Sequence, residues 1–209
     1  MIITLSGVDG SGKTTIGKML VEELRKKGFD VIYRVEFNYF LLGYLKKFIN
    51  VMTGDRNKAD AIRQKVIREK SYPNVAGRIW TYLTFLDLLM EYVYFKIFFK
   101  RKVVLMDRCI YDFLIGWKWI GYSTPLMEWL YLRFPHFDLS YVLDIDPRIA
   151  FERKEHEQDN DLYFFQTLRG LYKNYFDGRG NIVFLDTAEP IGDLIEKIAK
   201  DVDSQIARL

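Results

Sequence analysis

Short apolar runs rich in β-branched residues recur along the chain, and polar or glycine-containing segments separate them. Runs of about four to eight such residues are typical of strands that are buried on both faces of a sheet. The pattern predicts five strands, at residues 2–6, 30–35, 102–106, 140–145 and 181–185.

Segments with the helical spacing of apolar residues lie between these runs. They cover residues 13–27, a broken region at 41–70, 75–100, 111–132, 147–176 and 191–207. Strands that alternate with helices are typical of a parallel sheet, because each parallel pair needs a long crossover connection. The sequence therefore predicts an α/β fold, and residues 1–209 are interpreted as a single domain. The charged segment 50–72 fits an exposed helix, with a mobile substrate-side segment as the alternative.

One segment carries a specific chemical signature. Gly7 is followed by four residues and then by Gly12, Lys13 and Thr14, between the first predicted strand and the first predicted helix. This is the pattern and context of a phosphate-binding P-loop, in which backbone amides and a helix N-terminus surround a phosphate. The alternative is a glycine-rich turn. The loop residues predicted to bind the nucleotide are Gly7, Asp9, Gly10, Ser11, Gly12, Lys13, Thr14 and Thr15.

Lys13 and Thr14 have distinct predicted roles in this loop. The Lys13 ammonium is expected to reach the β- and γ-phosphates of ATP, and the Thr14 hydroxyl is expected to ligate Mg²⁺. Asp9 would repel a phosphate, so it is expected to face the acceptor, where it accepts a hydrogen bond from a sugar hydroxyl or pairs with an arginine. The alternative for Asp9 is a turn residue that bonds its own backbone.

A carboxylate and an arginine, Asp107 and Arg108, end the third predicted strand. Ligands of open α/β folds bind at the carboxyl ends of the strands. Asp107 is predicted to hold Mg²⁺ through water or to orient the acceptor, and Arg108 to make a two-pronged contact with a phosphate. A surface ion pair at a strand end is the alternative.

Composition and net charge limit the classes of ligand and the cellular compartment that are expected for this chain. A net charge of +3 suits an anionic ligand and is lower than expected of a nucleic-acid-binding surface. The single cysteine, Cys109, excludes an internal disulfide and a cysteine-based zinc cluster, which favours a reducing compartment. No signal peptide is expected before the loop, and the apolar stretch 83–99 contains three charges, so no membrane span is expected. A cytoplasmic location is the prediction.

Three segments together resemble the thymidylate kinase family. They are Gly-Val-Asp-Gly-Ser-Gly-Lys-Thr-Thr at 7–15, Asp107-Arg108, and Leu-Asp-Ile-Asp-Pro at 143–147. The similarity spans nearly the whole chain. It implies a three-layer P-loop kinase fold with a five-stranded parallel sheet in the order 2-3-1-4-5, flanked by helices, and a helical lid at about 148–165. Segments 108–112, 134–139 and 153–155 also resemble a less characterised branch of thymidylate-kinase-like proteins.

The resemblance implies roles for individual residues. Asp9 would face the sugar hydroxyl, Arg108 would hold the acceptor phosphate, and Arg153 would belong to the lid over the transferred phosphoryl group. Lys13, Asp107 and Arg153 are therefore the predicted catalytic residues, with Lys13 and Arg153 stabilising charge that develops during transfer. Further candidates are Arg34 near the acceptor base, Thr187 in an adenine-side loop at 186–188, and the lid-proximal Arg148 and Arg169.

The implied reaction is Mg²⁺-dependent transfer of the ATP γ-phosphoryl group to a nucleoside monophosphate, dTMP to dTDP. The chain departs from the familiar pattern at Leu5-Ser6, at 34–38, which lacks a Glu-Pro-Gly-Gly turn, and near Asp87-Leu88, where the family has an arginine. A kinase for a nucleoside or another small metabolite is therefore an alternative, and a nucleotide-binding switch without transfer is a rival of another class. The resemblance also suggests a homodimer through the long apolar helix at 75–100.

Overall fold

The computed structural model describes residues 1–35, 75–154 and 161–207. Its strands are β1 (Ile2–Gly7), β2 (Val31–Val35), β3 (Val103–Asp107), β4 (Leu139–Asp144) and β5 (Ile182–Asp186). Its helices are α1 (Lys13–Lys26), α4 (Val75–Phe98), α5 (Ile110–Trp119), α6 (Pro125–Arg133), α7 (Pro147–Lys154), α8 (Leu162–Phe176) and α9 (Ile191–Ile206). The broken region with helical spacing at 41–70 and residues 155–160 of the expected lid lie outside the described residues.

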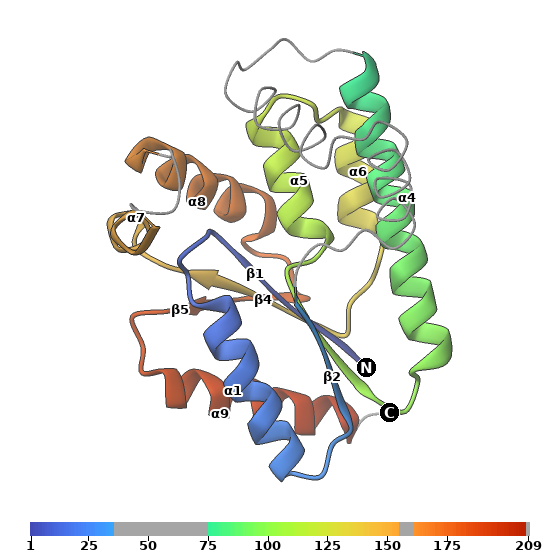
Figure 1. Ribbon diagram of the computed structural model, residues 1–209, viewed down its shortest axis with the longest axis vertical. Helices are drawn as coiled ribbons and strands as arrows, with labels where there is room; N and C mark the ends of the chain where they lie inside the picture. Colours follow the sequence, from blue (N-terminus) through green and yellow to red (C-terminus); the bar gives the residue numbers. More distant parts are fainter. Residues whose placement is uncertain (36–74, 155–160, 208–209) are drawn as a thin grey trace, which may run out of the picture.

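All five strands are parallel and lie in the order β2-β3-β1-β4-β5. This confirms both the predicted sheet and its strand order. Figure 1 shows three layers, with α1 and α9 against one face of the sheet and α4, α5, α6 and α8 on the opposite side. The central strand β1 is buried along its whole length, so the loop that follows it starts from a rigid position.

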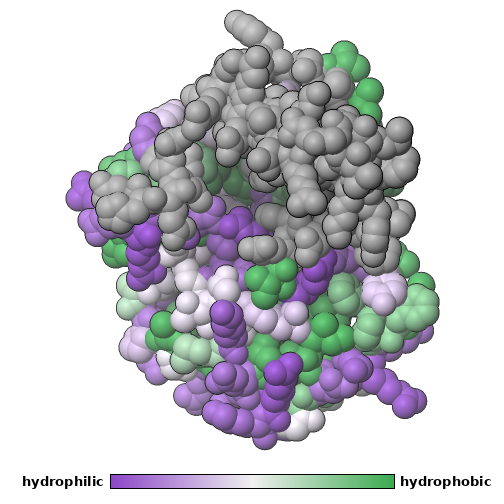
Figure 2. Space-filling model, in the orientation of Figure 1, coloured by the Kyte–Doolittle hydropathy of each residue, from purple (hydrophilic) through white to green (hydrophobic). Residues whose placement is uncertain are grey.

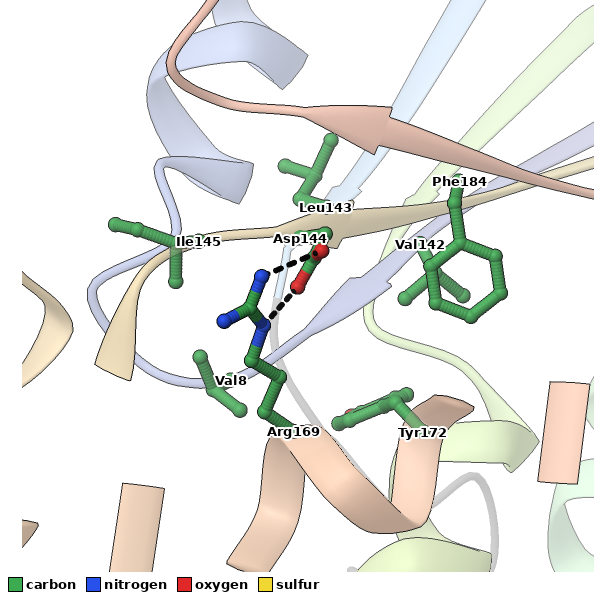
Figure 3. A pocket seen from close by; sticks show the side chains of 8 residues that line it. All are labelled: Val8, Val142, Leu143, Asp144, Ile145, Arg169, Tyr172 and Phe184. Carbon is green, nitrogen blue, oxygen red and sulfur yellow. Dashed lines mark hydrogen bonds and ion pairs between the residues drawn. The ribbon is translucent and has the colours of Figure 1, made fainter. Parts of the chain in front are cut away.

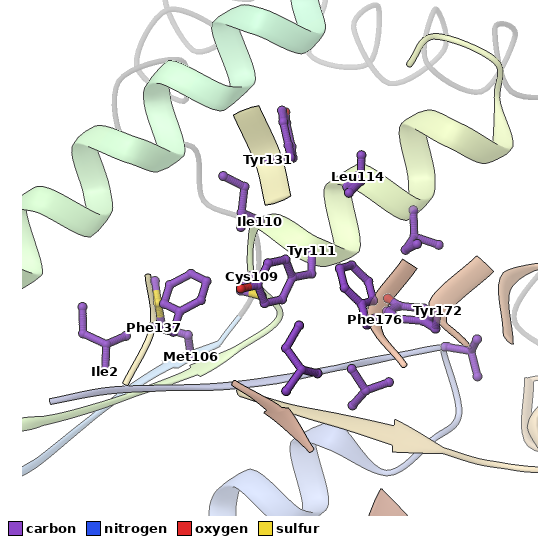
Figure 4. Close-up of a cluster of buried hydrophobic side chains, with 14 of the residues drawn as sticks. Ile2, Met106, Cys109, Ile110, Tyr111, Leu114, Tyr131, Phe137, Tyr172 and Phe176 are labelled. Atoms are coloured by element: carbon purple, nitrogen blue, oxygen red, sulfur yellow. The ribbon is translucent and has the colours of Figure 1, made fainter. Parts of the chain in front are cut away.

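Each face of the sheet has its own apolar core, because side chains alternate along a strand. Ile3 and Leu5 of β1 pack with apolar residues of α1 and α9, while Ile2 belongs to the core on the other face. Figure 4 shows that second core, where Tyr111 of α5 and Tyr172 and Phe176 of α8 meet. Helix α8 is thus fixed against this face of the sheet by aromatic packing.

Two predicted helices are each divided in the structure. The expected helix at 111–132 is α5 and α6, because Gly121 adopts a φ of 78° and the Thr124 side chain accepts the Met127 N–H at the start of a new helix. The expected helix at 147–176 is α7 and α8, and the Asp161 carboxylate caps α8 by accepting the Phe164 N–H. The sequence marks both breaks, with Gly121 before Thr124-Pro125 and with an all-polar run at 155–161, and the predicted helices ran through these signals.

Hydrophilic and hydrophobic residues are interspersed on the described part of the face in Figure 2, and hydrophilic ones gather at its lower edge, where Figure 1 places α1 and α9. Among the described residues, no helix combines the length and the apolar character that crossing a bilayer requires.

Candidate active site

The register of the sheet brings the predicted site residues to one edge. Leu5 of β1 and Val35 of β2 both pair with Asp107 of β3, and Gly7 pairs with Leu143 of β4. The carboxyl ends of four neighbouring strands therefore lie side by side, and each continues into a segment that carries polar groups. This is the edge at which open α/β sheets bind ligands.

The loop after β1 has the backbone of a phosphate cradle. Gly7, Gly10 and Gly12 have φ angles of 140°, 83° and 90°, a region that side-chain-bearing residues rarely adopt. A Cβ on Gly10 would also lie 2.9 Å from the Ala150 carbonyl oxygen of α7. Glycine at position 10 therefore lets a helix from the far half of the chain approach the loop closely.

The loop ends in donors that suit an anion. Gly12 is the N-cap of α1 and provides no side-chain cap, so the first amides of the helix have no intrahelical acceptor. Thr14 and Thr15 are exposed in this first turn. The Ser11 hydroxyl is buried and has no hydrogen-bond partner within the part of the chain that the structure describes. A buried donor without a partner is costly, and a phosphate oxygen would satisfy it.

Lys13 is held inside the loop. Its side chain is buried, and its ammonium donates to the carbonyl oxygens of Gly7 and Val8, both at 2.8 Å, with an Asp9 oxygen at 3.8 Å. Burial, and secondarily the Arg108 guanidinium, lower the pKa of Lys13 below its usual value. The ammonium thus lies within the concave side of the loop, where a phosphate would be an additional counter-charge.

The two predicted metal-binding residues meet. The Thr14 hydroxyl donates to Asp107 Oδ2 at 2.6 Å. Mg²⁺ prefers oxygen ligands and retains several waters, so a hydroxyl and a carboxylate in contact at the edge of a phosphate loop fit this ion. The described residues contain no group of three or more His, Cys, Asp or Glu side chains that could hold a metal. The donor set therefore suits a metal that is held mainly by phosphate oxygens and water.

A third residue, Tyr33 of β2, completes this contact and was missed in the sequence. Its hydroxyl donates to Asp107 Oδ2 at 3.2 Å and to the Thr14 carbonyl oxygen at 3.4 Å. The Tyr33 ring lies against α1 at Gly17, where an added Cβ would be 2.5 Å from the hydroxyl oxygen. A glycine inside an otherwise regular helix pattern was the available signal, since such a glycine can mark a close approach.

We expect Tyr33→Phe to raise the Mg²⁺ concentration needed for half-maximal activity by about three- to tenfold, because Asp107 loses one of the hydrogen bonds that orient it. Gly17→Ala should act in the same direction, since its methyl group displaces the Tyr33 ring. The matched control is Tyr82→Phe, which removes a hydroxyl bonded to Thr124, the N-cap of α6. Equal Mg²⁺ dependence in all four proteins would exclude the orienting role of Tyr33.

Arg108 has an unusual backbone. Its φ is 76°, and it is the single non-glycine residue with a positive φ among the described residues. Its N–H donates to the Leu5 carbonyl oxygen at 2.8 Å, and its guanidinium donates to Asp9 Oδ1. Strained backbone of this kind persists where surrounding contacts impose it. Asp9 and Arg108, predicted separately on the acceptor side, therefore contact each other beside the loop.

Arg153 of α7 reaches the loop from the opposite side. Its Nη1 donates to the Gly10 carbonyl oxygen at 2.9 Å. The lid-proximal Arg169 instead makes a two-pronged contact with Asp144 at 2.5 and 2.9 Å, and Lys173 adds a third cationic contact at 3.0 Å. Arg169 and Asp144 help to line a small pocket between the sheet edge and α8, as Figure 3 shows. These contacts connect α8 to the end of β4.

Two further predicted site residues, Arg34 and Thr187, lie at the same edge of the sheet and bond to other protein groups there. Arg34 donates from Nε to Glu91 Oε1 of α4 at 2.8 Å, and burial raises the Glu91 pKa although Arg34 opposes the shift. Thr187 donates from both its N–H and its hydroxyl to the Asp144 carbonyl oxygen, at 2.9 and 3.0 Å. Thr187 therefore fixes the loop after β5 to the end of β4, and its predicted contact with adenine stays a prediction. Arg148 is exposed on α7.

The sheet order and the loop at the central strand define a P-loop kinase fold. A deoxyadenosine kinase from M. mycoides, solved with the products dCMP and a flexible dCDP, superposes with a TM-score of 0.62 at 14% identity, over 98% of this chain and 100% of that one. No family model matches the chain.

Curated relatives match over almost the whole length. They include probable thymidylate kinases from Sulfurisphaera tokodaii (26% identical over 98% of this chain and 96% of that protein) and Methanosphaera stadtmanae (26%, 94% and 93%). A thymidylate kinase from Leptospira borgpetersenii is 27% identical over 83% of this chain and 77% of its own. The chain is accordingly a thymidylate kinase-like P-loop kinase.

Proposed function

We propose that this protein transfers the γ-phosphoryl group of ATP to a nucleoside monophosphate, with dTMP as the acceptor and dTDP and ADP as the products. The observation that carries the proposal is the contact between the loop and the end of β3. Thr14 bonds to Asp107 and Asp9 bonds to Arg108, so a pair of residues that can hold Mg²⁺ and a pair that can bind the acceptor lie next to each other at the end of β3. The names of the curated relatives support the same acceptor.

The donor side holds the triphosphate. The free amides at the start of α1, the Ser11 hydroxyl and the Lys13 ammonium surround the β- and γ-phosphates, and Lys13 exchanges its carbonyl partners for phosphate oxygens. Thr14 and Asp107 would hold Mg²⁺, directly and through water. When bound, this ion neutralises charge on the transferring group.

The acceptor side places the attacking oxygen. Arg108 binds the phosphate of the acceptor. Asp9 bonds to the Arg108 guanidinium and accepts a hydrogen bond from a sugar hydroxyl of the acceptor. The bond from the γ-phosphorus to the β,γ-bridging oxygen breaks as the bond to the acceptor oxygen forms. Arg153, now on the Gly10 carbonyl at the loop rim, would close on the equatorial oxygens of the transferring group.

A phosphate acceptor fits this site better than a hydroxyl acceptor. A phosphate monoester has its second pKa at about 6, so its attacking oxygen is already ionised at neutral pH and needs no general base. A nucleoside hydroxyl would need Asp107 as the base. Asp107 Oδ2 already accepts hydrogen bonds from the hydroxyls of Thr14 and Tyr33, which favours its role in orienting Mg²⁺.

A coupled assay of ADP formation across nucleoside monophosphates, nucleosides and sugar phosphates tests the proposal. We expect ADP release that depends on Mg²⁺ and on a nucleoside monophosphate, with dTMP giving the highest kcat/KM. Faster turnover with a nucleoside or a sugar phosphate would show that this compound, and not a nucleoside monophosphate, is the acceptor. ADP release that no acceptor changes, despite ATP binding, would favour the nucleotide-binding switch.

We propose further that two copies associate through α4. Six apolar side chains on this helix are between 39% and 55% exposed and alternate in spacing of four and three residues. This spacing forms one continuous seam suited to a second helix. The residues of this α4 seam are Ile79, Leu83, Leu86, Met90, Val93 and Ile97. The opposite side of the helix buries Thr81, Thr84, Asp87 and Glu91.

Sedimentation of wild type at micromolar concentration should give twice the chain mass. Leu86→Lys, at the centre of the α4 seam, should shift this to the monomer mass, because a charge would have to be buried between two helices. Lys100→Glu, an exposed charge change just beyond α4, is the control and should stay dimeric. A monomeric wild type would refute the seam as a dimer contact.

We also place the protein in a reducing compartment, the cytoplasm. Its only cysteine, Cys109, is buried beside Ser6, and burial raises the pKa of its thiol to about 12. Such a thiol is a poor nucleophile and behaves as a small apolar residue. The fold thus relies on no disulfide.

A further inference from the structure

Asp112, in the first turn of α5, is a buried carboxylate that the sequence did not single out. Its side chain accepts four hydrogen bonds, two on each oxygen. Oδ2 accepts from the Ser6 hydroxyl at 2.8 Å and the Cys109 N–H at 2.9 Å. Oδ1 accepts from the Gly7 N–H at 3.2 Å and the Tyr172 hydroxyl at 2.7 Å. With 8% of its surface exposed, Asp112 is satisfied almost entirely by the protein.

These four donors come from three separate parts of the chain. Ser6 and Gly7 end β1 and begin the phosphate loop, Cys109 directly follows Arg108, and Tyr172 lies on α8. A buried carboxylate is costly unless hydrogen bonds and nearby positive charges compensate it. Both kinds of compensation are present, because burial lowers the pKa of Lys13 and acts in the same direction on the pKa of Arg108, and the nearby Asp112 charge opposes this effect at both cations.

The two backbone contacts of Asp112 join the phosphate loop to the turn that carries Arg108. Asp112 holds the N–H of Gly7, whose carbonyl oxygen accepts from the Lys13 ammonium. It also holds the N–H of Cys109, the residue after the strained Arg108. One carboxylate therefore fixes the backbone at the base of both phosphate sites.

The contact with Tyr172 extends this arrangement to α8. One turn earlier on the same helix, Arg169 bonds to Asp144 at the end of β4. Tyr172 and Arg169 thus attach α8 to the carboxyl edge at two points, and α8 lies beside α7, which carries Arg153 to the loop. Asp112 is the point at which the loop, the turn of Arg108 and α8 meet.

We propose that Asp112 is a positioning residue that sets the donor loop and the acceptor arginine at their working separation and orientation. The inference rests on the proposed phosphoryl transfer, and it assigns to Asp112 no contact with a substrate. Transfer depends on alignment of the attacking oxygen with the γ-phosphorus, and misplacement of about 1 Å can cost about 10²-fold in rate.

Asp112→Asn tests the proposal with a side chain of the same shape. The NH₂ group of asparagine would replace one of the two accepting oxygens and would therefore face two hydrogen-bond donors. The negative charge of Asp112 beside Lys13 and Arg108 would also be lost. We expect kcat to fall by about 10²-fold and the dissociation constant of Mg²⁺·ATP, measured by calorimetry, to rise by about tenfold. Both are measured well below the melting temperature of each variant.

The matched control is Asp138→Asn, at the opposite end of β1. Asp138 Oδ2 accepts the Ile2 N–H at 2.6 Å and Oδ1 pairs with Lys96 at 3.1 Å, far from the loop. This variant should lose thermal stability while kcat and ATP affinity stay within about twofold of wild type. If Asp112→Asn behaves in the same way, Asp112 is purely structural and the inference is wrong.

Two milder variants decide the matter if Asp112→Asn does not fold. Tyr172→Phe and Ser6→Ala each remove one donor and keep the packing, and each should lower kcat by about three- to tenfold. Unchanged kcat in both would overturn the positioning role. If wild type binds Mg²⁺·ATP but phosphorylates no acceptor, the proposed function fails, and the ATP affinities of the three variants still decide the role of Asp112.

Discussion

Lys13→Ala should lower kcat by about 10³-fold, because one preorganised cation that faces developing charge is worth about 10²- to 10³-fold and Lys13 serves two phosphates. The side chain is 5% exposed and lies within the curve of the loop. Two other cations contact the loop among the described residues, but Arg108 bonds to the Asp9 side chain and Arg153 to the Gly10 carbonyl oxygen, so neither is placed to take over the role of Lys13. The measurement is single-turnover transfer at saturating ATP.

Lys18→Ala is the matched control for this result. Lys18 lies on the same helix, more than one turn beyond the loop, and is exposed, so its loss should leave kcat unchanged. Circular dichroism of both variants reports whether α1 is intact. An active Lys13→Ala protein with a normal fold would mean that the loop does not hold the transferring phosphates.

Arg108→Ala should lower kcat/KM for the monophosphate acceptor by about 10²- to 10³-fold, because a two-pronged, charge-assisted contact is lost from a partly buried site. The KM for ATP should change little, since the donor loop keeps its own ligands. Arg108→Lys should recover only a small part of the loss, because an ammonium cannot make the two-pronged contact. Steady-state kinetics with each substrate varied in turn provide the test.

Arg108→Gly separates the side chain from the backbone. Glycine adopts a φ of 76° without strain, so this variant should fold at least as well as Arg108→Ala and be equally impaired. A glycine variant that retains wild-type kcat/KM would show that the turn matters and that the guanidinium does not bind the acceptor.

The sheet was predictable because the inner strands β1, β3 and β4 are buried on both faces and so appear as largely apolar runs, and the edge strands β2 and β5 keep the same short apolar pattern. The loop was predictable because its glycines and Lys13 must occupy fixed positions around a phosphate. The helix boundaries at Gly121 and Asp161 were predictable as well, because a glycine and a run of polar residues at 155–161 mark them, but the apolar spacing on either side was given more weight.

The side-chain partners within the site were less accessible to sequence reasoning. Asp112 and Tyr172 are 60 residues apart and Tyr33 and Asp107 are 74 apart, so no local spacing relates them. Arg34 bonds to Glu91 on α4, a contact 57 residues away along the chain, and its predicted place near the acceptor base stays a prediction. Contacts of this kind follow from strand register and from which helix covers which face, and both emerge only from the whole fold.

Incubation of the protein with Mg²⁺, dTMP and ATP labelled in the γ-phosphate tests the central claim most directly. The label should appear in dTDP in a one-to-one ratio with the ADP formed, and at dTMP concentrations below its KM both should form about 10²- to 10³-fold more slowly in Arg108→Ala. ADP accompanied only by labelled inorganic phosphate, or no ADP with any nucleoside monophosphate, would contradict phosphoryl transfer at this site.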